Sequence, residues 1–270
     1  MDHRYSWMAS IQDRNLTKRI SHMGICRYSE NINGAWLVVS NDRWIRYGIE
    51  HVDLLRQDHW QFDQMISLIK GMRPGQTDVI DGGSNHGSWA IPLARNHTDL
   101  SFHMFEVQRL LYYTSCGSIA LNNAMNVYAN LLGLSNAAGS MELAVPNYDV
   151  DGNFGALEMQ VPFANSDHGH IYYTDKTETA KMVAIDDLGL SPVFIKLDLE
   201  GMEMPALAGA INTMKQHQPV VWCEVHKSNS DLLSAMMTDL GYTIQEDREK
   251  HWFFIPAWLK GNPRLADIFG

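Results

Sequence analysis

The chain has 270 residues, of which 45% are hydrophobic and 19% are charged. This composition excludes a largely disordered chain, a collagen-like repeat and a disulfide scaffold. The net charge of −10, with no cluster of basic residues, argues against partners such as nucleic acid or an anionic membrane. The three cysteines are far apart in the sequence, and no stretch is apolar enough for a signal peptide or a membrane span, so we expect a reduced, cytoplasmic protein.

The first part of the chain predicts an N-terminal extension, residues 1–73, that packs on a larger domain. Residues 36–39 and 44–47 are two short apolar runs around a polar Asn-Asp pair, which favours a β-hairpin. Residues 59–72 have apolar positions at helical spacing and are followed by Pro-Gly, which predicts an amphipathic helix.

From Thr77 onward, short apolar strands alternate with helices, and the domain is expected to span residues 74–270. The predicted strands are 78–81, 101–105, 127–134, 193–198, 220–225, 242–244 and 252–255, and the predicted helices are 89–95, 110–123, 204–215 and 231–240. This alternation indicates an α/β fold with a mostly parallel sheet and helices on both faces. Residues 139–183 break the pattern with short β-prone pieces, which we interpret as a β-rich insertion.

A glycine-rich loop follows the first strand of this domain, and ligands of such sheets bind at the carboxyl ends of the strands. The loop reads Asp81-Gly82-Gly83-Ser84-Asn85-His86-Gly87, which matches neither the dinucleotide nor the P-loop pattern. An acid opens the loop, which suits a cationic ligand. The next strand ends at Glu106, where a carboxylate can accept both hydroxyls of a ribose. Together these features predict a nucleoside with a cationic tail, S-adenosylmethionine.

Charged side chains also mark the strand at 193–198. Lys196 suits either an internal ion pair or a catalytic role, because an unpaired charge inside a covered sheet is costly. Asp198 and Glu200 follow at the strand end, whereas Glu203 is expected in the first turn of the next helix. His226, after the next strand, is a candidate general base because imidazole titrates near neutrality.

These segments resemble the FkbM family of S-adenosylmethionine-dependent methyltransferases. The matching strings are VIDGGSNHG from Val79, FEVQ from Phe105, IDDL from Ile185, IKLDLEGME from Ile195, and CEVH from Cys223. The resemblance implies a class I, Rossmann-like methyltransferase fold: a seven-stranded sheet whose last strand is antiparallel. It also implies S-adenosyl-L-methionine as cofactor, S-adenosyl-L-homocysteine as product, and O-methylation of a hydroxyl. Ser84 and His86 depart from the family pattern, and His86 is expected to touch the cofactor carboxylate or the acceptor.

The sequence and the resemblance together define the predicted site. The predicted catalytic residues are Asp198, His226 and Glu224. The predicted cofactor-binding residues are Asp81, Gly82, Gly83, Ser84, Asn85, Gly87, Glu106, Val107, Ser135, Asp198 and Glu200. No metal is expected, and His168 and His170 are interpreted as part of a solvated loop. Mg²⁺ held by Asp198 and Glu224 stays an alternative.

The acceptor is expected to be a small molecule or a glycan, chosen by the insertion between Asn147 and Tyr173. N-methylation of an amide or amine is an alternative, and so is a non-catalytic protein that binds S-adenosylmethionine. The tryptophans of the first 73 residues suit an acceptor, core packing or a dimer interface equally, so a homo-oligomer stays open.

Overall fold

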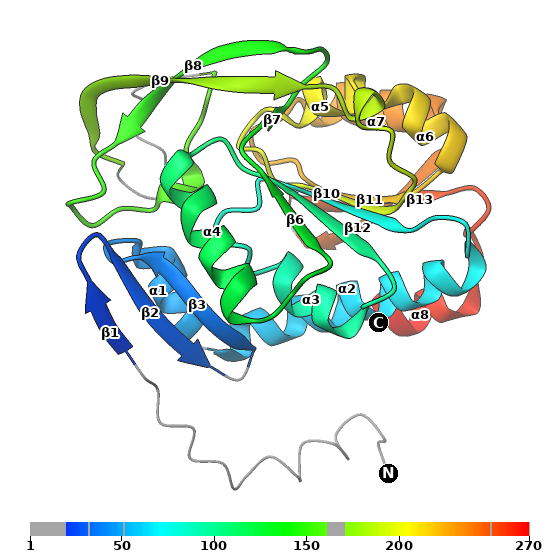
Figure 1. Ribbon diagram of the computed structural model, residues 1–270. Helices are drawn as coiled ribbons and strands as arrows, with labels where there is room; N and C mark the ends of the chain where they lie inside the picture. The colour runs from blue at the N-terminus through cyan, green and yellow to red at the C-terminus, as the bar shows by residue number, and fades with distance from the viewer. Residues whose placement is uncertain (1–19, 32, 51, 161–170, 249, 270) are drawn as a thin grey trace, which may run out of the picture.

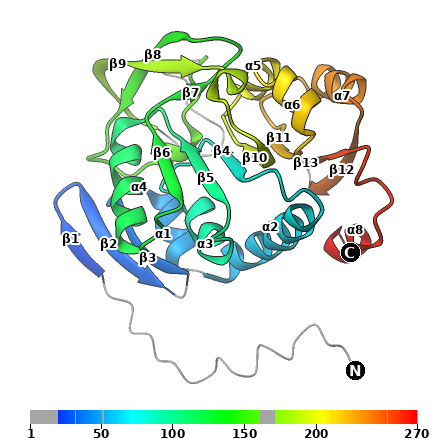
Figure 2. The same ribbon diagram turned by 45° about the vertical axis from the view of Figure 1, so that its right-hand side comes forward.

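A computed structural model describes residues 20–31, 33–50, 52–160, 171–248 and 250–269. Its centre is a seven-stranded sheet with the order β12-β13-β11-β10-β4-β5-β6 (Figures 1 and 2). The strands are β4 (Asp78–Gly82), β5 (Ser101–Phe105), β6 (Val127–Asn130), β10 (Pro192–Leu197), β11 (Val220–Glu224), β12 (Tyr242–Arg248) and β13 (His251–Pro256). Neighbours from β11 through β10, β4 and β5 to β6 pair in parallel, whereas β13 is antiparallel to both β11 and β12. The expected sheet, with its last strand antiparallel, is therefore confirmed.

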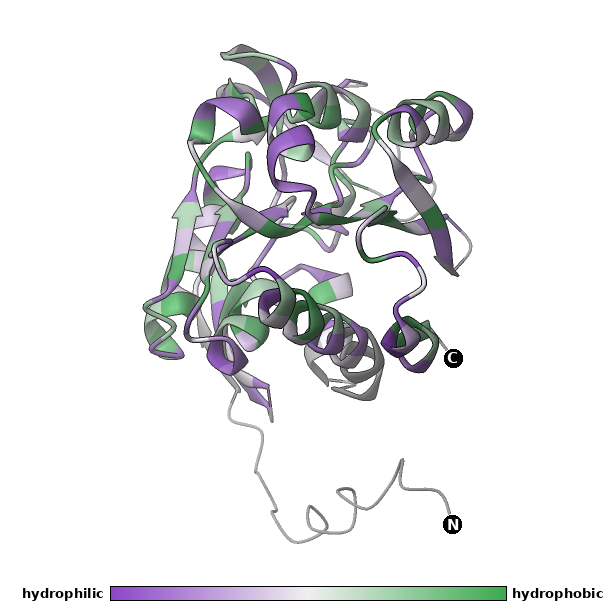
Figure 3. Ribbon diagram, turned by 90° about the vertical axis from the view of Figure 1, so that its right-hand side faces the viewer, coloured by the Kyte–Doolittle hydropathy of each residue, from purple (hydrophilic) through white to green (hydrophobic). Residues whose placement is uncertain are grey.

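Helices cover both faces of this sheet because neighbouring strand residues point to opposite sides. Val79 and Phe194 belong to one apolar cluster, and Ile80 and Ile195 belong to the other. The first cluster includes residues of α2 (Val52–Met72), α3 (Ala90–Asn96) and α8 (Pro263–Phe269). The second includes residues of α5 (Glu203–Ala208), α6 (Ile211–His217) and α7 (Ser230–Asp239). Figure 3 shows the two helical layers above and below the sheet.

The N-terminal part forms a separate antiparallel sheet, and here the predicted hairpin is wrong. The order is β1 (Ile20–Met23), β2 (Cys26–Asn31) and β3 (Gly34–Val39), so β3 pairs with β2. The residues expected as the second hairpin strand lie in helix α1 (Arg43–Glu50). The reason is a helix start: the Asp42 carboxylate accepts a hydrogen bond from the Ile45 backbone N–H at 3.0 Å. Strand β3 packs against α4 (Arg109–Leu121) (Figure 1).

The predicted strand 127–134 is divided between two sheets. Its first half is β6, and its end is β7 (Gly133–Leu134), which belongs to a three-stranded sheet of order β7-β9-β8. Leu132, between the two strands, lines a cavity at the strand ends. The β-prone pieces between 139 and 183 contain β8 (Gly139–Pro146) and β9 (Tyr173–Val183).

Two helix predictions are also corrected. The helix expected at 204–215 is two helices, α5 and α6, and Gly209 lies where they meet. A Cβ atom at Gly209 would lie 2.1 Å from the Ser135 carbonyl oxygen, so the close packing of this corner requires glycine. Helix α7 is capped by Asn229, which accepts from the Leu232 N–H at 3.1 Å, rather than by Ser230 or Asp231. Within the described ranges, no helix has both the length and the apolar character needed to cross a membrane.

Candidate functional site

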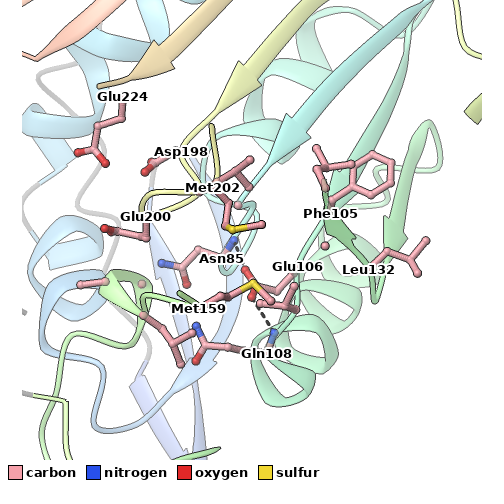
Figure 4. A pocket seen from close by; sticks show the side chains of 18 of the residues that line it. Asn85, Phe105, Glu106, Gln108, Leu132, Met159, Asp198, Glu200, Met202 and Glu224 are labelled. Carbon is pink, nitrogen blue, oxygen red and sulfur yellow. Dashed lines mark hydrogen bonds between the residues drawn. The ribbon is translucent and has the colours of Figure 1, made fainter. Parts of the chain in front are cut away.

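A cavity of about 440 Å³ lies at the carboxyl ends of β4, β5 and β10 (Figure 4). Parallel strands bring residues that are far apart in the sequence to this edge. Seven predicted site residues line the cavity: Gly83, Asn85, Glu106, Val107, Asp198, Glu200 and Glu224. Figure 4 shows the cavity with an apolar end at Phe105 and Leu132, and with Glu200, Asp198 and Glu224 at the opposite end.

Six other predicted residues do not line this cavity: Asp81, Gly82, Ser84, Gly87, Ser135 and His226. Asp81 and Ser84 are buried in the turn itself. Ser135 follows β7, and its carbonyl oxygen faces Gly209 instead of the cavity. The shape of the cavity therefore does not support the cofactor contacts predicted for the first five or the catalytic role predicted for His226.

The glycine-rich turn is shaped by close backbone packing. Gly83 has φ 74°, and a Cβ atom there would lie 1.8 Å from the Asp198 carbonyl oxygen. Only glycine fits both the conformation and the space. Asn85 has φ 52°, a left-handed conformation that is uncommon for a non-glycine residue. Its backbone N–H donates to the Glu106 carboxylate at 2.9 Å.

Glu106 joins the turn to the following helix. Its second carboxylate oxygen accepts from the Gln108 backbone N–H at 2.8 Å. Burial raises the pKa of Glu106 to about 7, although these backbone donors oppose the shift. A carboxylate has about four lone-pair sites, so two backbone donors leave acceptor capacity for a ligand.

Lys196 forms an internal ion pair, as the sequence allowed, but its nearer partner is Asp81 and not Asp198 or Glu200, which were expected. Its Nζ lies 3.1 Å from Asp81 Oδ1 and 3.6 Å from Asp198 Oδ2. Asp81 is fully buried, so this pair offsets the cost of burying its charge below the cavity floor. Of the three, only Asp198 lines the cavity.

Three carboxylates meet at one end of the cavity. Asp198, Glu200 and Glu224 each place an oxygen within 4.8 Å of the others. Withdrawal from bulk water raises the pKa of Asp198 to about 6; Lys196 opposes the shift and Glu224 adds to it. For Glu224, burial is outweighed by His251, whose Nε2 lies 3.7 Å from Oε1, and the pKa is lowered.

Glu200 is held by a lysine bridge. Lys227 Nζ lies 2.6 Å from Glu200 Oε2 and 2.8 Å from Glu158 Oε1, which ties the strand end to the segment after β8. Burial is the main cause that raises the pKa of Glu200 to about 7, and Asp198 adds to it. The three carboxylates offer oxygen ligands of the kind that Mg²⁺ prefers, so Glu200 extends the Asp198–Glu224 pair considered from the sequence.

Other cavity residues lie in segments that the sequence singled out without assigning them to the cofactor site. Trp44 of α1 lines the cavity, together with Asn153, Gly155 and Met159. Trp44 is one of the tryptophans considered for the acceptor, although the incorrect hairpin prediction hid its position. The other three residues fall between Asn147 and Tyr173, the segment expected to choose the acceptor.

The remaining sequence-based expectations have mixed outcomes. His86 was expected to touch the cofactor carboxylate or the acceptor, but it does not line the cavity. Its ring is fully buried and lies between Thr114 and Asp42. Glu203 lies in the first turn of α5 as predicted, and its carboxylate accepts from the backbone N–H groups of Leu199 and Gly201. His168 and His170 lie outside the described residues.

Comparison with known proteins identifies the family. The model described as "Methyltransferase FkbM domain" matches residues 81–244, which is more than half of the chain. Comparison with curated proteins gives no match.

Three solved structures are similar in part. The FkbM methyltransferase from Methylobacillus flagellatus KT is 19% identical, with a TM-score of 0.46 over 66% of this chain and 43% of that one. Precorrin-6y C5,15-methyltransferase from Geobacter metallireducens GS-15 is 12% identical, with a TM-score of 0.37 over 66% of this chain and 78% of that one. M. jannaschii TYW2 in complex with AdoMet is 10% identical, with a TM-score of 0.38 over 87% of this chain and 85% of that one. This chain thus spans less than half of the M. flagellatus protein, and the family assignment rests on the domain match. The chain belongs to the family of methyltransferases that contain an FkbM domain.

Proposed function

We propose that the protein transfers a methyl group from S-adenosylmethionine to a hydroxyl of a small molecule, sugar or natural product. The observation that carries this proposal is the layout of the cavity. It joins an apolar end beside Glu106 to an acidic end at Asp198 (Figure 4). S-adenosylmethionine supplies a methyl group on a positively charged sulfur, and its loss leaves S-adenosylhomocysteine.

The residues of the cavity fit this cofactor. Phe105 and Leu132 offer an apolar surface for a flat base, and the adjacent Glu106 can accept from ribose hydroxyls. The side-chain oxygen of Asn85 is buried and has no hydrogen-bond partner among the described residues. A buried acceptor without a donor is costly, and the ammonium group of the cofactor would satisfy it.

Asp198 is the proposed base for the transfer. It lines the cavity, its side chain is 37% exposed, and its raised pKa suits proton acceptance near neutral pH. Asp198 takes the proton of the acceptor hydroxyl while the oxygen forms its bond to the methyl carbon and the carbon–sulfur bond breaks. Alignment of the acceptor in the cavity is the main source of rate. Glu224 lies behind Asp198, whereas His226 does not line the cavity and is not included in this step.

Asp198→Ala tests this assignment. We expect methyl transfer to be lost while the affinity for S-adenosylmethionine changes little, because the ribose and amino contacts remain. The assay incubates the protein with methyl-tritiated S-adenosylmethionine and a low-molecular-weight cell extract, and calorimetry measures binding in parallel. Transfer at the wild-type rate by the variant would remove Asp198 from the reaction. No binding of S-adenosylmethionine to the wild type would overturn the proposed function.

The acidic end of the cavity also favours a second candidate, N-methylation. An amine acceptor is cationic at neutral pH and would be attracted to Asp198, Glu200 and Glu224. Mass spectrometry and NMR of the tritium-labelled product distinguish the two: a methyl ether supports the hydroxyl acceptor, and an N-methyl group supports the amine.

The prediction that no Mg²⁺ is needed can be tested in the same assay. Methyl transfer that survives EDTA supports it. Transfer that is lost with EDTA and restored by Mg²⁺ would instead assign Asp198, Glu200 and Glu224 as ligands.

A further inference from the structure

A buried hydrogen-bond network lies directly behind the glycine-rich turn. His86 follows Asn85, but its side chain is fully buried and points away from the cavity. The His86 Nδ1 lies 2.7 Å from Thr114 Oγ1 on α4, and Nε2 lies 3.4 Å from Asp42 Oδ2. One imidazole therefore contacts two elements that belong to different parts of the fold.

Thr114 fixes the orientation of this ring. Its Oγ1 lies 2.7 Å from the Leu111 carbonyl oxygen, to which the hydroxyl donates, and 2.7 Å from His86 Nδ1, so this hydroxyl joins the ring to α4. The other ring nitrogen must then face Asp42. A rotated ring would leave buried polar atoms without partners, which costs more than the hydrogen bonds are worth on average.

Asp42 connects this contact to the N-terminal part of the chain. It is fully buried, and its other carboxylate oxygen starts helix α1 through the Ile45 N–H. The start of α1 is also joined to the residue before Asn153, which lines the cavity, because the Arg43 backbone N–H donates to the Gly152 carbonyl oxygen at 2.9 Å. Gly152 N–H in turn donates to the Asn41 carbonyl at 3.0 Å. The position of α1 is thus linked to the turn through His86.

The turn needs such support because its conformation is unfavourable. A non-glycine residue with positive φ persists only where its surroundings fix it, and Asn85 has φ 52°. Its N–H bond to Glu106 holds one side of the turn. The anchored ring of His86 holds the other side, at the next residue of the chain.

We propose that His86 is a positioning residue: anchored by Thr114 and Asp42, it keeps Asn85 in the conformation that binds the cofactor. This inference rests on the proposed function for its ligand. It gives Asp42, in the N-terminal part of the chain, a role in cofactor binding that acts through the turn.

The test compares His86→Phe with His97→Phe. His97 is a matched control, since it is also buried and its Nε2 lies 3.1 Å from Asp63, but it follows α3 and is not part of the glycine-rich turn. Calorimetry with S-adenosylhomocysteine should show an affinity about tenfold lower for His86→Phe, equal to about 1.4 kcal/mol. The affinity of His97→Phe should stay within about twofold of the wild type on the same scale.

Hydrogen exchange in the free protein tests the positioning separately from the ligand. The Asn85 amide, protected by Glu106 in the wild type, should exchange about tenfold faster in His86→Phe and not in His97→Phe. If His86→Phe does not fold, Thr114→Val removes the same anchor from its other end. Unchanged Asn85 exchange in the folded variants would overturn the inference. If the Asn85 amide exchanges faster in His86→Phe than in the wild type, but the wild type binds no S-adenosylhomocysteine, the positioning role stands and the proposed function fails.

Discussion

Glu106 is the residue whose protonation should control cofactor binding. Because its folded-state pKa is raised to about 7, the free protein loses stability from this group as pH rises from 4.5 through 7. The ionised form, however, is the one that accepts from both ribose hydroxyls. We therefore expect the affinity for S-adenosylmethionine to be roughly tenfold higher at pH 8 than at pH 6, with proton release on binding below pH 7.

Glu106→Gln should weaken binding at pH 8 and remove most of this pH dependence, because the amide does not titrate. Calorimetry at the two pH values measures both effects. Asp99→Asn, at an exposed site paired with Lys70, is the control and should leave the profile unchanged. A pH profile that is the same in the wild type and Glu106→Gln would contradict the ribose role.

At the residue scale, the sequence predicts the position of a side chain when neighbouring residues in the chain determine that position. Glu106 and Asp198 could be placed at strand ends because an apolar run ends just before each of them. The direction of His86 could not be predicted, since it depends on Asp42 and Thr114 from other elements. Trp44 was considered for an acceptor, for core packing or for a dimer interface, but its element was wrong because helix α1 has too few residues for a periodic signal to exceed the strand pattern.

At the scale of elements, α2 is attached to the sheet by an aromatic cluster. The Phe62 ring lies 5.3 Å from Trp89, 5.6 Å from Trp222 and 5.7 Å from Phe253, measured between centroids. Phe62→Ala should lower the free energy of unfolding by about 3–5 kcal/mol, because it leaves a cavity among large rings.

The same helix supplies the control. Trp60 is 48% exposed, and Trp60→Ala should change the free energy of unfolding by less than about 1 kcal/mol. Urea denaturation measures both variants. Equal effects of the two substitutions would show that α2 is not packed as the structure describes.

The strands and helices of the parallel sheet could be predicted because each has a clear apolar period and a turn at its end. The hairpin error had a local cause, the helix start at Asp42, whereas two other errors arose where contacts distant in sequence overrode local preference. Strand β7 leaves the main sheet to pair with β9, and the corner at Gly209 divides α5 from α6 so that the chain can pack against Ser135.

At the scale of the whole molecule, the N-terminal part and the sheet share one core. Trp36 and Phe62, from the first 73 residues, belong to the same apolar cluster as Val79 and Phe194. We therefore propose that the N-terminal extension, as far as the structure describes it from residue 20, belongs to the same domain as the sheet and is not an independent unit. Differential scanning calorimetry should show a single transition whose calorimetric and van't Hoff enthalpies agree. Two separable transitions would contradict this organisation.

We propose that the cavity between Glu106 and Asp198 binds S-adenosylmethionine with its methyl group toward the acidic end. A crystal structure of the full chain with S-adenosylhomocysteine tests this orientation. We expect ribose hydroxyls on Glu106, the amino group beside the Asn85 side-chain oxygen, and the sulfur facing Asp198. A nucleoside bound elsewhere, or bound here with its sulfur directed away from Asp198, would contradict it.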